Sequence, residues 1–410
     1  MSVSVPVTAG SGELPAPAAD GAGGYDRRAI TYLAAAHGVD DFYQAAVPAL
    51  VPFFVVAHSL SYQAAAVAVL VSNLLSSLLQ PLFGYWADRR RAPWLVWGGM
   101  GLAGIGVSLA VLVDSFPLVL AFCGVTGVGI AAFHPEASRA TAQASGRRRG
   151  AGMSLFALGG NAGFALAPLA VVPLASSYGI RAVGVLIIPA LVMMAYLARN
   201  AVQWQVVPVG RTHTGPGGGA RVPDAWGAFA RLTGAVGMRS IVFFGLNTFL
   251  PIYWATRFNL TLAAGGVALT VLLVVGVAGT LLGGRAADRF GARAVVVACS
   301  CALGPLLWLF LQADDRLVAL GLLVPLALAL SAPFSVMVVL GQQYLPRHVG
   351  TASGVTLGLA VTVGGLAAPF LGRMADQHGV AAALGLLVWT ALLAALISLT
   401  LSPVPGSRSA

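Results

Sequence analysis

Apolar stretches of about twenty residues recur from residue 30 to the C-terminus, separated by short polar segments. Each is long enough to cross roughly 30 Å of hydrocarbon at about 1.5 Å per residue. The pattern predicts an all-α membrane protein with twelve transmembrane helices. The predicted spans are residues 30–56, 62–86, 93–113, 117–134, 150–175 and 180–198, followed by 237–255, 262–284, 294–311, 317–341, 350–372 and 380–401.

A short motif divides these spans into two halves. The sequence GYWADR (84–89) closes the second predicted span, and GRAADR (284–289) closes the eighth, 200 residues later. A repeat at this distance indicates a duplicated six-helix unit, so we predict two pseudo-symmetric six-helix bundles. Glycine permits close helix approach, and aspartate favours a neighbouring helix N-terminus, which for Asp88 is the predicted eleventh helix near Gly350. We expect a role in conformational change for Gly84, Asp88, Arg89, Gly284, Asp288 and Arg289.

The polar segments outside the spans predict the domain boundaries. Residues 1–28 are rich in Ala, Gly, Ser and Pro, which is typical of a disordered tail. The Gly-rich interval 201–236 is predicted to be a linker between the halves. The bundles then comprise residues 29–200 and 237–402, and residues 403–410 form a second tail.

Composition and charge support this topology. The chain is 58% hydrophobic and 9% charged, against about 25% charged in soluble domains. The net charge is +10, and all 23 basic residues are arginines. With a cytoplasmic N-terminus nineteen arginines fall inside and four outside, as the positive-inside rule requires, so tails and linker are predicted to be cytoplasmic. No nucleic-acid partner is expected.

The first predicted span carries four polar residues on one helix face. His37, Asp40, Asp41 and Gln44 are spaced i, i+3, i+4 and i+7. Asp40 and Asp41 lie about 15 Å into the span, where an ionised Asp costs about 2.5–3.5 kcal/mol. Repulsion and desolvation favour protonation of at least one carboxyl group. We predict proton coupling at His37, Asp40 and Asp41; the alternative is a static polar face satisfied within the bundle.

Further polar residues are candidates for the cavity or for a proton relay. In the fourth span, Glu136 is a candidate relay beside His134 and Arg139, or else forms an interfacial ion pair with Arg139. The other spans offer side chains that contact substrate or join helices, with an interfacial aromatic belt as the alternative for the tyrosine. These are Gln44, Asn73, Gln80, Asn247 and Tyr253. Neither a metal-ligand cluster nor an activated nucleophile is evident from the spacing of residues.

Several segments carry a resemblance to a known family. They are HGVDDFYQ (37–44), FHPEASR (133–139), GGNAG (159–163) and TFLPIY (248–253). The chain resembles the fosmidomycin-resistance-type exporters of the major facilitator superfamily. The resemblance implies a multi-pass protein of the bacterial inner membrane with a central cavity, which Asn161 would line, open to each side in turn. It also implies proton-driven efflux of small drug-like or phosphonate-like compounds.

The resemblance implies partners and leaves alternatives open. The expected partners are a small-molecule substrate, protons and the lipid bilayer, with no cofactor or metal, no enzyme activity and a monomeric state. Cys123 precedes Gly127 by four residues, where drug/proton antiporters usually carry an arginine. An importer or symporter of a small organic anion or sugar is therefore a second hypothesis. A non-transporting membrane receptor or enzyme is a third, which the two-fold repeat disfavours.

Overall fold

The computed structural model describes residues 24–60, 62–90, 92–200, 223–260 and 262–404. Most of the predicted tails and linker lie outside these residues. The first bundle contains α1 Arg27–His58, α2 Tyr62–Arg89, α3 Trp94–Ala110, α4 Phe116–Ala144, α5 Arg149–Tyr178, the 3-10 helix η1 Ile180–Leu186 and α6 Ile187–Arg199. The second contains α8 Trp226–Arg257, α9 Leu262–Phe290, α10 Ala292–Gln312, α11 Arg316–Ser331, α12 Pro333–Tyr344, α13 Val349–His378 and α14 Val380–Leu399.

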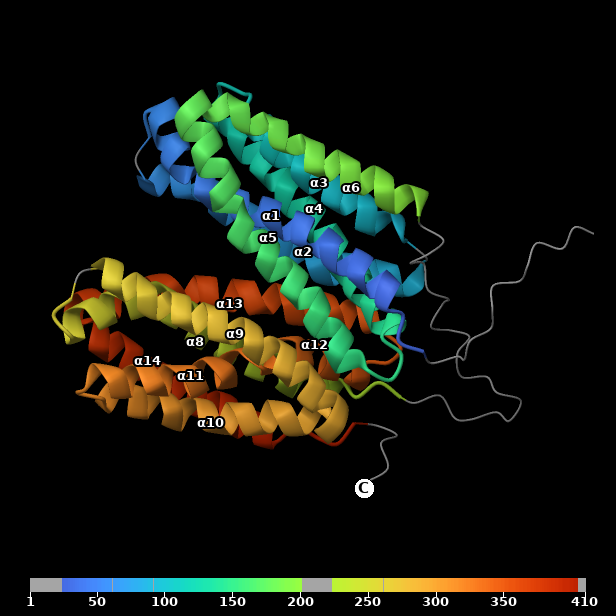
Figure 1. Ribbon diagram of the computed structural model, residues 1–410. Helices are drawn as coiled ribbons and strands as arrows, with labels where there is room; N and C mark the ends of the chain where they lie inside the picture. The colour runs from blue at the N-terminus through green and yellow to red at the C-terminus, as the bar shows by residue number, and fades with distance from the viewer. Residues whose placement is uncertain (1–23, 61, 91, 201–222, 261, 405–410) are drawn as a thin grey trace, which may run out of the picture.

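The predicted helical membrane architecture is confirmed. Within the described residues, eleven helical segments are long and apolar enough to cross a membrane, and the shorter apolar helix α3 makes twelve. Two of the eleven segments join consecutive elements, η1 with α6 and α11 with α12. Two six-helix bundles result, each formed by one half of the chain (Figure 1).

Three helix boundaries differ from the predictions. The fourth predicted span ends at residue 134, but α4 runs unbroken through Pro135, from Phe116 to Ala144. The tenth span instead breaks before Pro333, where α11 ends and α12 begins. The seventh helix begins at Trp226 rather than at residue 237, within the predicted linker. Arg239 therefore lies thirteen residues inside α8 (239 − 226) and does not belong to the loop arginines counted for topology.

The two bundles meet at one end of the molecule and separate toward the other (Figure 1). We call the end where α2 and α9 terminate, near Asp88 and Asp288, the motif end. A single buried hydrophobic cluster there includes Phe156 of the first bundle and Phe229 of the second. Three further clusters are each confined to one bundle. Apolar packing thus joins the bundles at the motif end.

Hydrogen bonds join the bundles in the same region. The Ser154 hydroxyl of α5 donates to the Thr280 carbonyl of α9 at 2.8 Å and lies 3.0 Å from the Ser335 hydroxyl of α12. The Gln342 amide of α12 donates to the Ser138 hydroxyl of α4 at 3.2 Å. When α11 and α12 are taken as one membrane span, these contacts lie in the half of each span nearer the motif end, so the structure is closed at that end.

Candidate functional site

The helix pair α1 and α5 approaches very closely beside the predicted proton-coupling residues. A Cβ atom added to Gly163 would overlap the backbone of Gly38. One added to Gly159 would overlap the backbone of Ala34, and one added to Gly160 would overlap the Asp41 carboxylate and the His37 ring. Because only glycine leaves this space free, the GGNAG segment sets the distance between the two helices.

This approach brings four titratable side chains together inside the first bundle. His37 Nε2 lies 3.2 Å from Asp41 Oδ2, and His134 Nε2 of α4 lies 3.3 Å from Asp41 Oδ1. The two Nε2 atoms are 3.3 Å apart. Asp40 Oδ2 lies 3.5 Å from His134 Nδ1. We call His37, Asp40, Asp41 and His134 the His-Asp cluster.

Backbone carbonyl groups assign one proton to each imidazole of the cluster. His37 Nδ1 lies 2.8 Å from the Phe156 carbonyl oxygen, and His134 Nδ1 lies 3.0 Å from the Ile130 carbonyl oxygen. A carbonyl oxygen only accepts, so both Nδ1 atoms are donors. In the neutral imidazoles both Nε2 atoms are then acceptors, and they face each other and the Asp41 carboxylate. Hydrogen bonding among these three groups requires at least one additional proton or another cation.

The cluster is almost fully enclosed by protein. Asp40 has no exposed surface, and both of its carboxylate oxygens lack a hydrogen-bond partner in the described structure. The His37 ring stacks on Phe156 with 4.0 Å between ring centroids. Water is thus largely excluded, which favours neutralisation of the buried charges by bound protons or by each other.

The same geometry forms a candidate metal-ligand group that the spacing of residues in the sequence did not reveal. His37, Asp41 and His134 offer ligand atoms that all lie within 4.8 Å of one another. Imidazole and carboxylate groups are ligands that divalent transition metals accept. Sequence spacing missed this group because Asp41 and His134 are 93 residues apart (134 − 41) and come from different helices.

Glu136 and Arg139 form a separate pair on α4. Arg139 Nε donates to Glu136 Oε2 at 2.9 Å, and Nη2 donates to Oε1 at 2.5 Å. Glu136 is buried, and 13% of the Arg139 side chain is exposed. The i, i+3 pairing expected from sequence is present, inside the protein rather than at an exposed surface.

The other candidate cavity residues of the first bundle do not join the His-Asp cluster. Gln80 is buried against Gly354 and Gly358 of α13, and its amide donates to Ser76 at 3.1 Å. It therefore lies where the two bundles meet. The remaining candidates differ in exposure: Gln44 and Asn73 are partly buried, and Asn161 is exposed.

The candidates in the second bundle have local packing partners. The Asn247 amide donates to the Phe243 carbonyl of its own helix at 2.8 Å. Tyr253 is buried in the hydrophobic cluster of the second bundle, and its hydroxyl donates to the Leu311 carbonyl at 3.2 Å. These contacts favour a packing role for Tyr253 over both substrate contact and an interfacial belt.

The repeated motif makes equivalent contacts in both bundles. Asp88 accepts hydrogen bonds from the backbone N–H groups of Gly350 and Thr351 at 2.7 and 2.8 Å, as its predicted position near the eleventh helix requires. Asp288 accepts from the N–H groups of Gly150 and Ala151 at 2.7 and 2.9 Å. Each carboxylate thus caps the N-terminus of a helix in the other bundle, where the helix dipole favours negative charge.

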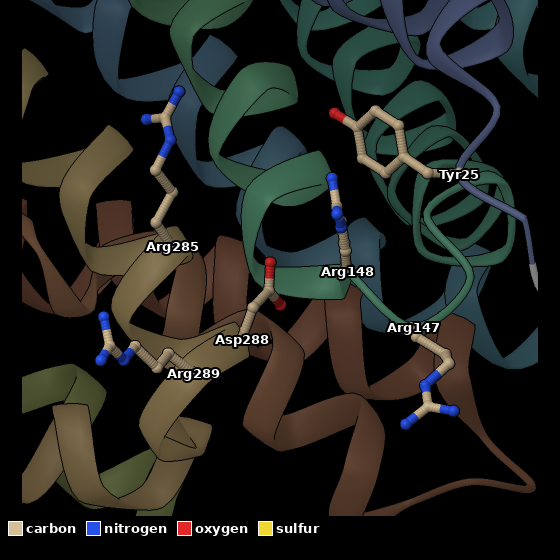
Figure 2. Close-up of a pocket in the computed structure, with 6 residues that line it drawn as sticks. All are labelled: Tyr25, Arg147, Arg148, Arg285, Asp288 and Arg289. Carbon is tan, nitrogen blue, oxygen red and sulfur yellow. The ribbon is translucent and has the colours of Figure 1, made fainter.

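The neighbouring motif residues surround these caps. Added Cβ atoms on Gly84 and Gly284 would overlap the backbones of Gly350 and Gly150, so both glycines permit close approach of the bundles. Figure 2 shows Asp288 directed at the start of α5, in a pocket at the motif end. Arg89 is exposed and lies over the Tyr85 ring. The pocket is lined by Tyr25, Arg147, Arg148, Arg285, Asp288 and Arg289.

One buried charge was not predicted from the sequence. Arg239 of α8 is 5% exposed, and its Nη1 donates to the Leu330 carbonyl at 3.1 Å. It was counted among the nineteen cytoplasmic arginines because the predicted span began at residue 237, eleven residues after the start of α8 (237 − 226). An arginine inside a predicted span was the available signal, because ionisable residues in membrane segments are rare and usually functional.

Comparison with known proteins identifies the family. The family model described as Major Facilitator Superfamily matches residues 33–369. The chain belongs to the major facilitator superfamily. An uncharacterized MFS-type transporter of Bacillus subtilis, YfnC, is 30% identical over 356 residues, which cover 84% of this chain and 85% of that protein. The fosmidomycin resistance protein of Escherichia coli is 28% identical over 380 residues, which cover 90% of this chain and 92% of that protein.

Solved structures confirm the major facilitator fold. FucP, described as a major facilitator transporter in the outward conformation, superposes with a TM-score of 0.74 over 93% of this chain and 100% of that chain, at 14% identity. The human organic anion transporter MFSD10 gives a TM-score of 0.70 over 91% of this chain and 99% of that chain, at 18% identity. The predicted resemblance to a transporter of this superfamily is confirmed by the family match and the two curated relatives.

Proposed function

We propose that this transporter is a proton-coupled exporter of small drug-like or phosphonate-like compounds, with the motif end in the cytoplasm. The His-Asp cluster carries the proposal. It presents three facing acceptor groups that need an additional proton, and it lies inside a bundle that must move relative to its partner. The relationship to a fosmidomycin resistance protein at 28% identity supports efflux as the direction of transport.

The arrangement supports alternating access by a rocking movement of the two bundles. In the closed-motif-end form, Asp88 and Asp288 hold helices α13 and α5 of the opposite bundles. Asp41 is the most exposed member of the cluster, at 14% of its side chain, so it is the first group that a proton from the cavity would reach. Opening the motif end would break both caps and give the cluster access to the cytoplasm.

Within the cluster, Asp41 and the imidazoles share the transported proton, and Asp40 holds a second one. Asp40 lies behind His134 with no exposed surface, so its charge responds to the charge of that imidazole. Glu136, two residues beyond His134 on the same helix, acts as a secondary relay toward the motif end. Its bidentate partner Arg139 holds the carboxylate in place until the bundles move.

A susceptibility assay tests the proposed function. Cells that express the wild-type protein should tolerate at least about four-fold more fosmidomycin than cells with an empty vector, and a protonophore should abolish the difference because it removes the driving force. Asp41→Asn should lose protection at equal membrane abundance. Asp114→Asn is the matched control, because that aspartate forms an exposed ion pair with Arg181.

Two results would argue against the proposal. Protonophore-insensitive protection by the wild-type protein would show that the pump uses another energy source. Protection that disappears after treatment with a chelator, and returns with a divalent metal, would show that the cluster binds a metal ion rather than the coupling proton.

A further inference from the structure

A buried arginine in the second bundle occupies the position that corresponds to Asp40 in the first. Asp40 is thirteen residues after the first residue of α1 (40 − 27), and Arg239 is thirteen residues after the first residue of α8. At about 1.5 Å per residue both lie about 20 Å along their helices. The ring of Phe334, which is 200 residues after His134, lies 5.2 Å from the Arg239 guanidinium carbon. In the second bundle, a cation and an aromatic ring therefore occupy the positions that Asp40 and His134 occupy in the first.

Within the part of the chain that the structure describes, the Arg239 guanidinium has no counter-charge. Its Nε is buried without a hydrogen-bond partner, and Nη1 bonds only to the neutral Leu330 carbonyl. Among the described residues no carboxylate pairs with it. Three other arginines among the described residues do form ion pairs: Arg139 with Glu136, Arg181 with Asp114, and Arg257 with Asp314. Because arginine stays protonated and an unpaired buried charge is costly, an anion from outside the chain would stabilise Arg239.

Arg239 lies next to the layer where the two bundles join. Phe334 packs beside its guanidinium, and the following residue, Ser335, lies 3.0 Å from the Ser154 hydroxyl of α5. Two residues further along α5, the Phe156 carbonyl holds His37 of the His-Asp cluster. A short path of direct contacts thus connects the buried cation with the cluster across the bundle interface.

We infer that Arg239 binds the anionic group of the transported substrate, a phosphonate, phosphate or carboxylate. This inference rests on the proposed function for its direction of transport. The planar guanidinium matches two oxygens of such a group, and the rings of Phe334 and Phe243, at 5.2 and 5.9 Å, hold it by cation–π contacts. A bound proton would neutralise negative charge in the His-Asp cluster, and a bound anion would neutralise the positive charge of Arg239.

Ligand binding to the purified protein tests this inference. Wild-type protein in nanodiscs is titrated with fosmidomycin, methylphosphonate and the uncharged dimethyl ester of methylphosphonate at constant ionic strength, by calorimetry and thermal unfolding. The wild-type protein should bind the two anions at least about tenfold more tightly than the ester. Arg239→Gln should lose at least about tenfold in anion affinity, and Arg239→Lys should lose less. Arg90→Gln, which removes an exposed arginine, should match the wild type.

The outcomes separate this inference from the proposed function. Folded Arg239→Gln protein with wild-type anion affinity would overturn the inference, even if extrusion remained sensitive to a protonophore. Equal binding of the anion and its ester by wild-type protein would overturn it as well, and needs no variant. Conversely, anion binding that depends on Arg239, together with protonophore-insensitive extrusion, would support the inference and refute proton coupling.

Discussion

At the scale of single residues, the candidate site depends on glycines, which have no side chain, as well as on the titratable side chains. Gly38, Gly159, Gly160 and Gly163 let the backbones of α1 and α5 come together, and the imidazole of His37 fits between α1 and α5 as a result. A methyl group at this contact would push the helices apart and with them the groups that share a proton.

Gly163→Ala tests this packing. The added Cβ would overlap the backbone of Gly38, so we expect the free energy of unfolding to fall by roughly 1–3 kcal/mol and proton-driven transport to weaken. Thermal unfolding of purified protein measures the first effect. Gly365→Ala is the control, because a Cβ there meets nothing within 4 Å and alanine favours a helix. Equal melting temperatures for the two variants would contradict the close-packing account.

The pair of Glu136 and Arg139 allows a second test at this scale. Arg139→Ala leaves the buried Glu136 carboxylate without its partner, which is expected to cost roughly 3–5 kcal/mol of unfolding free energy. The double variant Glu136→Gln/Arg139→Ala should recover part of this loss because no unpaired charge remains. A double variant as unstable as the sum of the two single variants would show that the pair does not interact.

At the scale of helices, each motif carboxylate acts as a removable cap on a helix of the other bundle. The caps of Asp88 on α13 and Asp288 on α5 are related by the internal repeat, and both hold the motif end closed. An amide in place of either carboxylate removes the charge that favours the helix N-terminus and leaves the shape almost unchanged.

Asp88→Asn should therefore shift the protein toward the form that is open at the motif end. We expect a cysteine introduced at Ser138, which lies at the bundle interface, to react at least about threefold faster with a water-soluble maleimide in this variant. Asp314→Asn, at the opposite end, should leave the rate unchanged. Unchanged labelling and unchanged transport in Asp88→Asn would rule out a role for the cap in closure.

Sequence periodicity was enough to predict the helices but not all of their ends or partners. The apolar period and the repeat of residues 84–89 at 284–289 predicted twelve helices in two bundles, and the Asp88 contact near Gly350 followed from helix polarity. The start of α8 could not be placed because polar residues continue a helix beyond the lipid when protein covers them. Likewise, His134 could be assigned to a helix, but its contact with Asp41 could not be predicted, since contacts between helices far apart in the sequence leave no local pattern.

At the scale of the whole molecule, the arginine distribution supports one orientation of the transporter in the membrane. The motif end carries Arg147, Arg148, Arg285 and Arg289 around one pocket, which fits the cytoplasmic side under the positive-inside rule. The opposite end carries Arg257, paired with Asp314. We propose this orientation for the protein in the cell.

Cysteine labelling in intact cells checks the orientation. In an otherwise cysteine-free protein, single cysteines at Arg147 and in the Gly217 region should be protected from an impermeant maleimide, because the cytoplasm holds them. Cysteines at Arg257 and Asp314 should react. Labelling of the Gly217 region in intact cells would contradict the twelve-span topology.

Proton-driven movement of substrate through the His-Asp cluster is the central claim, and transport in proteoliposomes tests it most directly. With purified protein and an imposed pH gradient, wild type should move radiolabelled fosmidomycin against its concentration gradient. Asp40→Asn or Asp41→Asn should abolish this accumulation while downhill exchange of substrate continues, because asparagine keeps the shape of aspartate but cannot bind and release a proton. Gradient-driven accumulation at the wild-type rate in both single variants and in the double variant would contradict the claim.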